Sequence, residues 1–381
     1  MPLISVVTPC YNAAGFIAAT VESVRAQTLG DWEMIVIDDG SSDGSPAIIE
    51  AIGDRRVRVL RQANAGPSAA RNTGIAAARG GYIAFLDADD LALPHRLAAQ
   101  AAVLDADPEL AAVASGYEWI DEDGAILPAA HSWQYPFDLN TLRDWLFDCP
   151  LVPSATMIRR DAWAAVGGFK ESLRGGEDWH FWMRVLLSRR RMAWLKEVVA
   201  HYRRLPGGLA SDGTRMARDC TSVLHEIIAH PAFPAELAEA ARQGLALRHV
   251  DGAKREFATG LWREGRADLA TAIELDPALI SGRPCRIEME LLNVALDPLT
   301  PDPLAFLGTA FSYLPDSAAG LRPRRDDARL RYHVAQADRS FRQGAYRRAA
   351  THAVRAVTQR PALLAAPRSW SAVARALRGE M

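Results

Sequence analysis

The chain has 381 residues, with 44 Lys and Arg against 46 Asp and Glu. This near balance of charge excludes a protein that binds nucleic acid through its overall charge, and no apolar run approaches the roughly 18 residues of a transmembrane helix. The length exceeds what one hydrophobic core usually serves, so we expect two domains. Four scattered cysteines without a CxxC pair predict neither a zinc site nor a disulfide framework.

The first hundred residues alternate between strand and helix patterns. β-Branched and apolar runs predict strands at 3–8, 32–40, 57–61 and 82–86. Capping residues, turns and helical spacing of apolar residues predict helices at 13–27, 42–52 and 66–78. Strands that alternate with helices imply parallel βαβ units, so we predict a mostly parallel, doubly wound α/β sheet.

Polar side chains follow three of these predicted strands. They are Thr8, Pro9, Cys10, Tyr11 and Asn12 after the first, Asp38 and Asp39 after the second, and Asp87, Asp89 and Asp90 after the fourth. Ligands bind outside the carboxyl ends of parallel strands, which share one edge of the sheet. The three clusters therefore predict a binding cleft at that edge.

The pattern changes after residue 110. The predicted elements are a hairpin that turns at Asp123-Gly124, a short helix at 141–147, a helix in GGEDWHFWMRVLLSRRR (175–191) and a last strand in AWLKEVVAHYRR (193–204). From about residue 215 onward the signal is almost wholly helical. We therefore predict an α/β domain at 1–214, followed by an all-α domain at 215–381.

The helical part contains an internal repeat. Residues 250–279 align without gaps to residues 334–363, and the shared positions include Phe257/Phe341 and Gly260/Gly344. Aromatic and small residues at fixed offsets, closed by a proline, are what two packed antiparallel helices need. The pattern resembles a tetratricopeptide-type helical hairpin. The alternative is a plain helical domain whose halves were duplicated.

The acidic segment FLDADD (85–90) directly follows an apolar run. Side chains two positions apart in an extended segment point to the same side, so Asp87 and Asp89 can grip one cation. Mg²⁺ and Mn²⁺ prefer such oxygen ligands and take the remainder from substrate phosphates. Most acidic runs only cap a helix or face water, but this one ends a predicted buried strand. We therefore expect Mn²⁺ or Mg²⁺ at this segment.

Four segments carry a resemblance to a known family: SVVTPCYN (5–12), VIDDGSSDGS (36–45), NAGPSAARNTGIAAARGGYIAFLDADD (64–90) and GGEDWHFWMR (175–184). In this order and spacing they resemble family 2 glycosyltransferases, which are inverting nucleotide-sugar enzymes with a GT-A fold. The resemblance covers about residues 1–210. It implies transfer of a single sugar from a nucleotide-diphosphate sugar, with a UDP-sugar favoured, to a hydroxyl acceptor. The implied setting is bacterial surface polysaccharide or glycoconjugate synthesis.

The resemblance also implies which residues bind the nucleotide sugar. Thr8, Pro9 and Tyr11 would line the base and ribose, and Asp39 would hydrogen-bond the base. Arg71, in the AARN segment, would contact the donor nucleotide or its phosphates. In this family the leaving diphosphate gathers negative charge, which a metal and a basic residue neutralise.

The remaining roles concern the metal and the reaction. The resemblance implies that Asp87 and Asp89 form the DxD motif, in which Asp87 would lie nearer the ribose and sugar and Asp89 would be the direct metal ligand. Asp178 resembles the catalytic base. Inversion is one in-line displacement, so a single positioned carboxylate can take the acceptor proton. Without the other motifs, Asp178 would be interpreted as a helix N-cap. Glu177 and Trp179 are expected to shape the acceptor pocket.

The chain departs from the family pattern after the last predicted strand. Leu205 stands where many family members carry a His, which some of them use to bind the metal. We therefore expect Asp89 and the diphosphate as the main metal ligands. The QxxRW motif of processive synthases is absent, which favours single transfer. Two alternatives stay open: a non-catalytic nucleotide-sugar-binding scaffold that acts through its helical repeats, and a nucleotidyltransferase. The latter should have a basic, glycine-rich loop after the first strand, and TPCYNAAG has no Lys or Arg.

The C-terminal segment is strongly basic. Residues 322–381 contain 14 Arg and four acidic residues, which suits an anionic membrane surface or an acidic partner, although a solvated helical face is the simpler interpretation. The N-terminus enters a strand without a signal-peptide pattern, so we expect a cytoplasmic protein, peripheral at the inner membrane face if the basic segment binds lipid. A glycan or lipid-linked acceptor would fit this setting.

Overall fold

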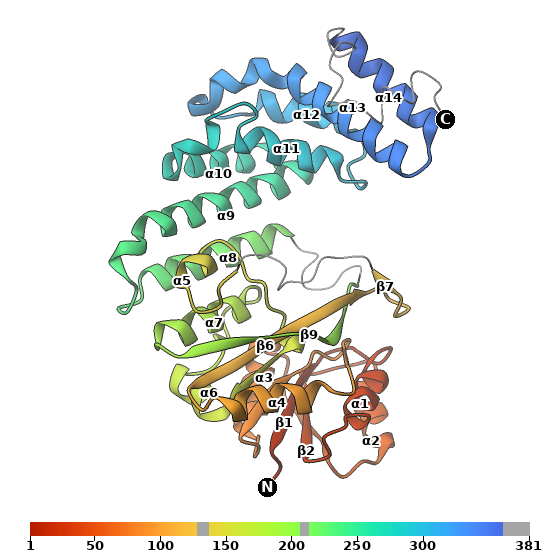
Figure 1. The fold of residues 1–381 in the computed structure, drawn as a ribbon, viewed down its shortest axis with the longest axis vertical. Helices are drawn as coiled ribbons and strands as arrows, with labels where there is room; N and C mark the ends of the chain where they lie inside the picture. The colour runs from red at the N-terminus through yellow and green to blue at the C-terminus, as the bar shows by residue number, and fades with distance from the viewer. Residues whose placement is uncertain (128–136, 206–212, 361–381) are drawn as a thin grey trace. The chain divides into compact units, whose positions relative to one another are not determined.

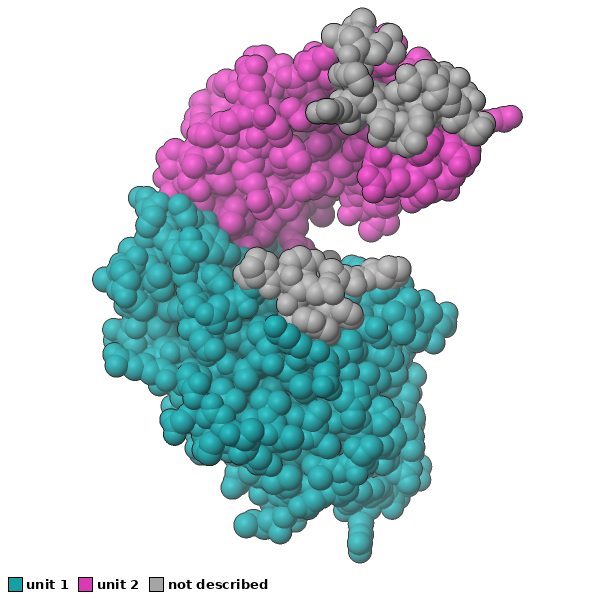
Figure 2. All heavy atoms as spheres, viewed as in Figure 1, with its two compact units in different colours: residues 1–244 teal, residues 245–381 magenta. Residues whose placement is uncertain are grey.

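The computed structural model describes residues 1–127, 137–205 and 213–360. The chain forms two compact units, residues 1–244 and 245–381 (Figure 2). The division falls later than the predicted boundary at residue 214, because helix α8 (Gly213–Ile228) packs against helix α7 (Glu177–Leu187) of the first unit. No helix among the described residues is long and apolar enough to cross a membrane.

In the described part of the first unit, nine strands form one sheet with the order β3-β2-β1-β4-β8-β6-β9-β5, in which β7 pairs with β6 (Figure 1). Its strands are β1 (Ile4–Cys10), β2 (Trp32–Asp38), β3 (Val57–Arg61), β4 (Tyr82–Phe85), β5 (Leu91–Ala92), β6 (Leu110–Ile120), β7 (Ile126–Leu127), β8 (Thr156–Arg159) and β9 (Arg191–Arg203). The first four strands pair in parallel, as predicted. The predicted hairpin is confirmed by the antiparallel β6–β7 pair, whereas β8 is antiparallel to both its neighbours and makes the sheet mixed.

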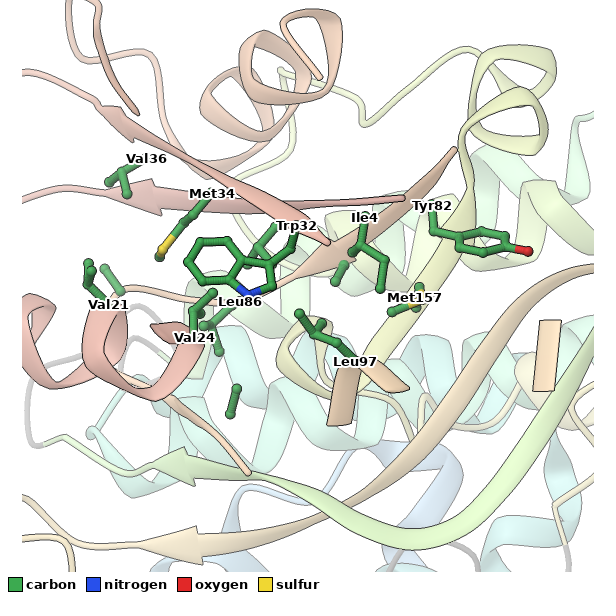
Figure 3. Packing of buried hydrophobic residues seen from close by; sticks show 14 of the residues in the cluster. Ile4, Val21, Val24, Trp32, Met34, Val36, Tyr82, Leu86, Leu97 and Met157 are labelled. Carbon is green, nitrogen blue, oxygen red and sulfur yellow. The ribbon is translucent and has the colours of Figure 1, made fainter. Parts of the chain in front are cut away.

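Helices cover both faces of this sheet. Besides α7 and α8, they are α1 (Ile17–Arg25), α2 (Ser45–Ile52), α3 (Pro67–Ala76), α4 (Arg96–Ala106), α5 (Leu142–Trp145) and α6 (Arg160–Val166). Helices α1, α2 and α4 share one core with the sheet, which includes Ile4, Trp32 and Met34 (Figure 3). Every residue of β2 is buried, as expected for a parallel strand covered on both sides.

Helix α3 lies on the opposite face and approaches the sheet closely. A Cβ atom at Gly74 would lie 2.5 Å from Val7 Cγ1 and 2.9 Å from Ile37 Cδ1, so only glycine fits there. This contact fixes the height of α3 above β1 and β2. Arg71, one turn earlier in the same helix, is therefore held at the carboxyl edge of these strands.

The second unit is helical. Its helices are α9 (Ala238–Ala258), which begins in the first unit, α10 (Trp262–Leu275), α11 (Arg286–Leu296), α12 (Pro303–Ser312), α13 (Arg325–Arg342) and α14 (Tyr346–Gln359). Apolar residues from α9 to α13 form one continuous core, and α13 and α14 share a smaller one. The predicted fold class, an α/β domain followed by an all-α region, is thus confirmed.

The internal repeat corresponds to two helical hairpins with the same turn. In the first, Leu261 N donates to Glu256 O at 2.7 Å across Gly260, whose φ is +83°. In the second, Ala345 N donates to Ser340 O at 2.8 Å across Gly344, whose φ is +73°. This 6→1 bond around a left-handed glycine is the Schellman helix end.

The aromatic pairs of the two hairpins also correspond. Phe257 stacks on Trp262 with ring centroids 5.3 Å apart, and Phe341 meets Tyr346 at 5.5 Å. The repeat is therefore visible in backbone and side chains alike. The likeness to tetratricopeptide hairpins stays a prediction.

Candidate active site

The three predicted polar clusters meet at one edge of the sheet. Asp39 N donates to Cys10 O at 2.8 Å, and Leu86 N donates to Val7 O at 3.1 Å. The segments that follow β1, β2 and β4 are thereby joined side by side just beyond the strands. This edge is where open α/β sheets bind ligands.

The residues predicted to line the nucleotide differ in their accessibility. Tyr11 is 55% exposed, whereas Thr8 is fully buried and its Oγ1 has no hydrogen-bond partner among the described residues. Pro9 is half-buried. In this conformation Tyr11 offers the most accessible surface for a base or ribose.

Asp39 is buried and largely occupied by the chain itself. Its Oδ1 accepts hydrogen bonds from Gln62 Nε2 at 2.7 Å and Ala65 N at 2.9 Å, and its Oδ2 accepts one from Gly66 N at 2.8 Å. A carboxylate offers about four acceptor positions, so one remains on Oδ2. Asp39 thus orders the loop before α3 and keeps one position for a ligand N–H.

The DxD loop, residues 87–90, is held by hydrogen bonds from distant segments. Asp87 N donates to Ser154 Oγ at 2.9 Å, and Ser154 Oγ donates to Asp90 Oδ2. Asp90 Oδ1 also accepts from Arg203 N at 2.8 Å, and Arg203 Nε donates to Asp89 O at 2.8 Å. Asp90 is completely buried, so it anchors the loop and cannot contact a ligand.

Asp89 has the surroundings of a cation ligand. Burial and the charge of Asp87 raise the pKa of Asp89 to about 6. No Lys or Arg forms an ion pair with the Asp89 carboxylate among the described residues. In the same part of the chain, no group of three or more His, Cys, Asp or Glu gathers as a complete metal site. The residues fit a Mg²⁺ or Mn²⁺ ion that takes its further ligands from phosphates and water.

Arg71 bridges two carboxylates. Its Nη1 donates to Glu177 Oε1 at 2.7 Å, its Nη2 donates to Asp87 Oδ1 at 2.8 Å, and the residue is only 3% exposed. From the sequence, Arg71 was expected to contact the donor nucleotide or its phosphates. Its pairing with two carboxylates was not predicted. Both partners are themselves predicted site residues.

Asp178 lies in the first turn of α7, and Trp179 N donates to its Oδ1 at 2.8 Å. Burial, followed by the neighbouring charge of Glu177, raises the pKa of Asp178 to about 7. Arg71 and the Trp179 N–H oppose this rise. A carboxylate with such a pKa is suited to general-base catalysis near neutral pH.

The two residues predicted for the acceptor pocket are both buried. Glu177 pairs with Arg71, and Trp179 is 3% exposed with its Nε1 donating to Trp145 O at 2.8 Å. In a first helical turn, neighbouring side chains diverge by about 100°, so adjacent positions reach different surroundings. Trp179 therefore packs in the interior, and a role of either residue in the acceptor pocket stays a prediction.

Tyr202, which the sequence analysis did not single out, lies near the carboxylates of the candidate site. Burial and nearby carboxylates, Asp87 foremost, raise the pKa of its hydroxyl, which therefore stays protonated. Its ring meets Trp119 at 4.9 Å and Tyr117 at 5.8 Å between centroids, along the β6–β9 pair. Ser154 and Arg203 were missed as well. Their roles arise from contacts across 64 to 114 residues, and no local pattern signals them.

Leu205, where the chain was expected to depart from the family pattern, is partly buried. His201, a nearby histidine in β9, has its Nε2 3.4 Å from Glu118 Oε2, which accounts for this side chain without a metal.

Solved structures share the fold of the chain. TarS residues 1–349 of S. aureus, in complex with UDP-GlcNAc, gives a TM-score of 0.58 over 85% of this chain and 92% of that one, at 19% identity. The mannosyltransferase PcManGT of Pyrobaculum calidifontis, in complex with GDP-Man and Mn²⁺, gives 0.54 over 84% and 87%, also at 19% identity. At such identity the likeness establishes the GT-A-like fold alone.

Relatives in sequence establish the family. The putative teichuronic acid biosynthesis glycosyltransferase TuaG of Bacillus subtilis is 31% identical over 59% of this chain and 88% of its own length. The O-antigen biosynthesis protein RfbC of Myxococcus xanthus is 32% identical over 62% of this chain and 19% of its own length. The chain spans less than a third of the length of the first curated relatives that it matches. The model of glycosyl transferase family 2 matches residues 5–167. The chain therefore belongs to glycosyltransferase family 2.

Proposed function

We propose that this protein is an inverting, metal-dependent glycosyltransferase that moves one sugar from a nucleotide-diphosphate sugar to a hydroxyl acceptor. The observation that carries the proposal is the base-like Asp178, joined through Glu177 and Arg71 to the DxD residue Asp87. This connection supports a single site that combines a base for the acceptor with a loop for the donor diphosphate.

The reaction requires one displacement at the anomeric carbon. The acceptor oxygen forms a bond to this carbon while the bond to the diphosphate oxygen breaks, and the leaving diphosphate takes the electron pair. Asp178 removes the acceptor proton as the bond forms. Asp87 and Asp89 would hold a Mg²⁺ or Mn²⁺ ion, which would neutralise charge on the leaving diphosphate. Asp90, Ser154 and Arg203 keep the loop that supplies these carboxylates in place.

The relatives support a donor class and a biological setting for this proposal. UDP-GlcNAc and GDP-Man occupy two relatives of the same fold, and one of these also holds Mn²⁺. We propose a UDP-sugar as the first donor class to test. TuaG and RfbC bear names from teichuronic acid and O-antigen biosynthesis, which supports a role in bacterial surface polysaccharide or glycoconjugate synthesis.

Calorimetric titration with UDP, GDP and dTDP, each with Mn²⁺ and with a chelator, tests the proposal. We expect metal-dependent binding of one nucleotide, followed by release of that diphosphate from the matching sugar donor in the presence of an acceptor. Binding without turnover would favour the scaffold alternative. If no nucleotide binds under either condition, the proposed function is wrong.

A membrane surface is the proposed partner of the basic C-terminal region. In α14, Arg347, Arg348 and Arg355 are exposed, and none of them pairs with an acid among the described residues. Val354, 54% exposed, lies on the same outer face, whereas the buried side of the helix consists of Ala349, Ala353 and Ala356. An outer face that combines arginine and an apolar residue suits anionic lipid.

Replacing these three arginines by Gln is expected to weaken association with vesicles of phosphatidylcholine and phosphatidylglycerol at low salt by roughly 100-fold. The estimate uses about 1 kcal/mol per arginine at an anionic surface. Co-sedimentation measures the effect. The matched control replaces Arg325, Arg342 and Arg360, which are exposed but pair with acids, and loses the same charge. Equal binding by both triple variants would contradict a lipid-binding face on α14.

A further inference from the structure

The Arg71 guanidinium connects the base helix to the metal-binding loop. It holds Glu177, 106 positions away in the sequence, and Asp87, 16 positions away, at 2.7 and 2.8 Å. The Arg71 side chain is 4% exposed, and those of Glu177 and Asp87 are 12% and 22% exposed. Ion pairs shielded from water to this degree hold a defined geometry, unlike exposed pairs.

The shape of the guanidinium makes this connection rigid. Its N–H groups form a planar fork, so two carboxylates bound to its two ends are held at a fixed separation. Glu177 belongs to the first turn of α7, and the next residue is Asp178. Fixing Glu177 therefore fixes the direction in which Asp178 leaves the helix.

We propose that Arg71 and Glu177 are positioning residues, which form a bridge that holds the Asp178 carboxylate in place relative to the DxD loop. This inference rests on the proposed function and deepens it. It replaces the expected role of Glu177 in the acceptor pocket and gives Arg71 a structural task inside the site besides any contact with phosphate.

The bridge has an electrostatic consequence that a packing role would lack. The negative charge of Glu177 lies beside Asp178 and favours its protonated form. Substituting Gln keeps the size of the side chain and removes the charge, so Asp178 should titrate at lower pH. The other titratable or charged groups near Asp178 are Arg71 from α3, Asp87 after β4, Cys149 after α5 and Tyr202 from β9.

The first experiment measures the titration of Asp178 directly. Metal-free protein with ¹³C-labelled aspartate carboxyls is titrated by NMR, and Asp178→Asn assigns the signal. For Glu177→Gln we expect the Asp178 midpoint to move down by roughly one pH unit. The matched control is Glu171→Gln, an exposed carboxylate that accepts a hydrogen bond from Asn72 on the same helix as Arg71. This control should leave the midpoint unchanged.

The second experiment separates positioning from donor binding. Arg71→Lys keeps the charge, but an ammonium lacks the fork that spans both carboxylates. We expect kcat to fall at least tenfold, while the Kd for nucleotide diphosphate with Mn²⁺ stays within about threefold. A Kd that rises in proportion to the fall in kcat would make Arg71 a donor contact instead and overturn the bridge.

The bridge and the proposed function are contradicted by different results. An unchanged Asp178 midpoint in Glu177→Gln contradicts the bridge, whether or not the protein turns over a donor. If Asp178 of the wild type titrates as expected but the protein transfers no sugar, the proposed function is wrong. The Asp178 midpoint in Glu177→Gln then still decides whether the bridge exists.

Discussion

Replacing Asp178 by Asn is expected to lower the rate of sugar transfer by roughly 100- to 10,000-fold, the usual contribution of a general base. Asparagine has nearly the same shape, so it can still accept the hydrogen bond from Trp179 N at 2.8 Å. It cannot take a proton from the acceptor at neutral pH. The affinity for nucleotide diphosphate should stay within about threefold, because the DxD loop and Asp39 are untouched.

Steady-state kinetics and calorimetry on the same preparations measure these two quantities. The control is Asp161→Asn in α6, where the same change falls on a side chain that is 75% exposed. It should leave both kcat and Kd unchanged. If Asp178→Asn loses diphosphate binding together with activity, Asp178 has a structural role and another residue must be the base.

The parallel half of the fold could be predicted because its signals are local. Strands β1, β2 and β4 are short runs of mainly apolar residues, β3 (VRVLR) combines Val and Leu with Arg, and each ends at polar residues or a turn. The β6–β7 hairpin is signalled by Asp123-Gly124. Strand β8 was missed because its four residues, TMIR, are too few to show a period. It takes its place by pairing with β4 and β6, which are distant in the sequence.

The domain boundary and the site also depend on long-range contacts that local sequence patterns do not reveal. The helical pattern begins near residue 215, but α8 belongs to the first unit because of what it packs against. The sequence places Asp87, Asp89 and Asp178 in recognisable motifs. It does not reveal that Arg71 lies between Asp87 and Glu177, or that Trp179 turns inward, since those contacts join helices and loops whose approach depends on the whole sheet.

Replacing Asp89 by Ala should weaken Mn²⁺-dependent binding of nucleotide diphosphate by roughly 100-fold, because a divalent ion at the phosphates contributes several kcal/mol and Asp89 is its proposed ligand. A substitution of Asp89 is easier to interpret than one of Asp87, because Asp87 also pairs with Arg71 at 2.8 Å. No ion pair of the described residues is lost with Asp89, and one of several neighbouring like charges is removed. The variant should therefore fold and be at least as stable as the wild type.

Calorimetry with Mn²⁺ and with chelator isolates the metal contribution. In chelator, Asp89→Ala and the wild type should bind the diphosphate equally, and only the wild type should gain affinity when Mn²⁺ is added. Asp161→Ala, an exposed aspartate in α6, should behave as the wild type in both conditions. An Asp89→Ala variant that retains the full gain from Mn²⁺ would place the ion on other ligands. Because no cluster of three potential ligands exists among the described residues, Asp87 and the diphosphate would then have to hold it.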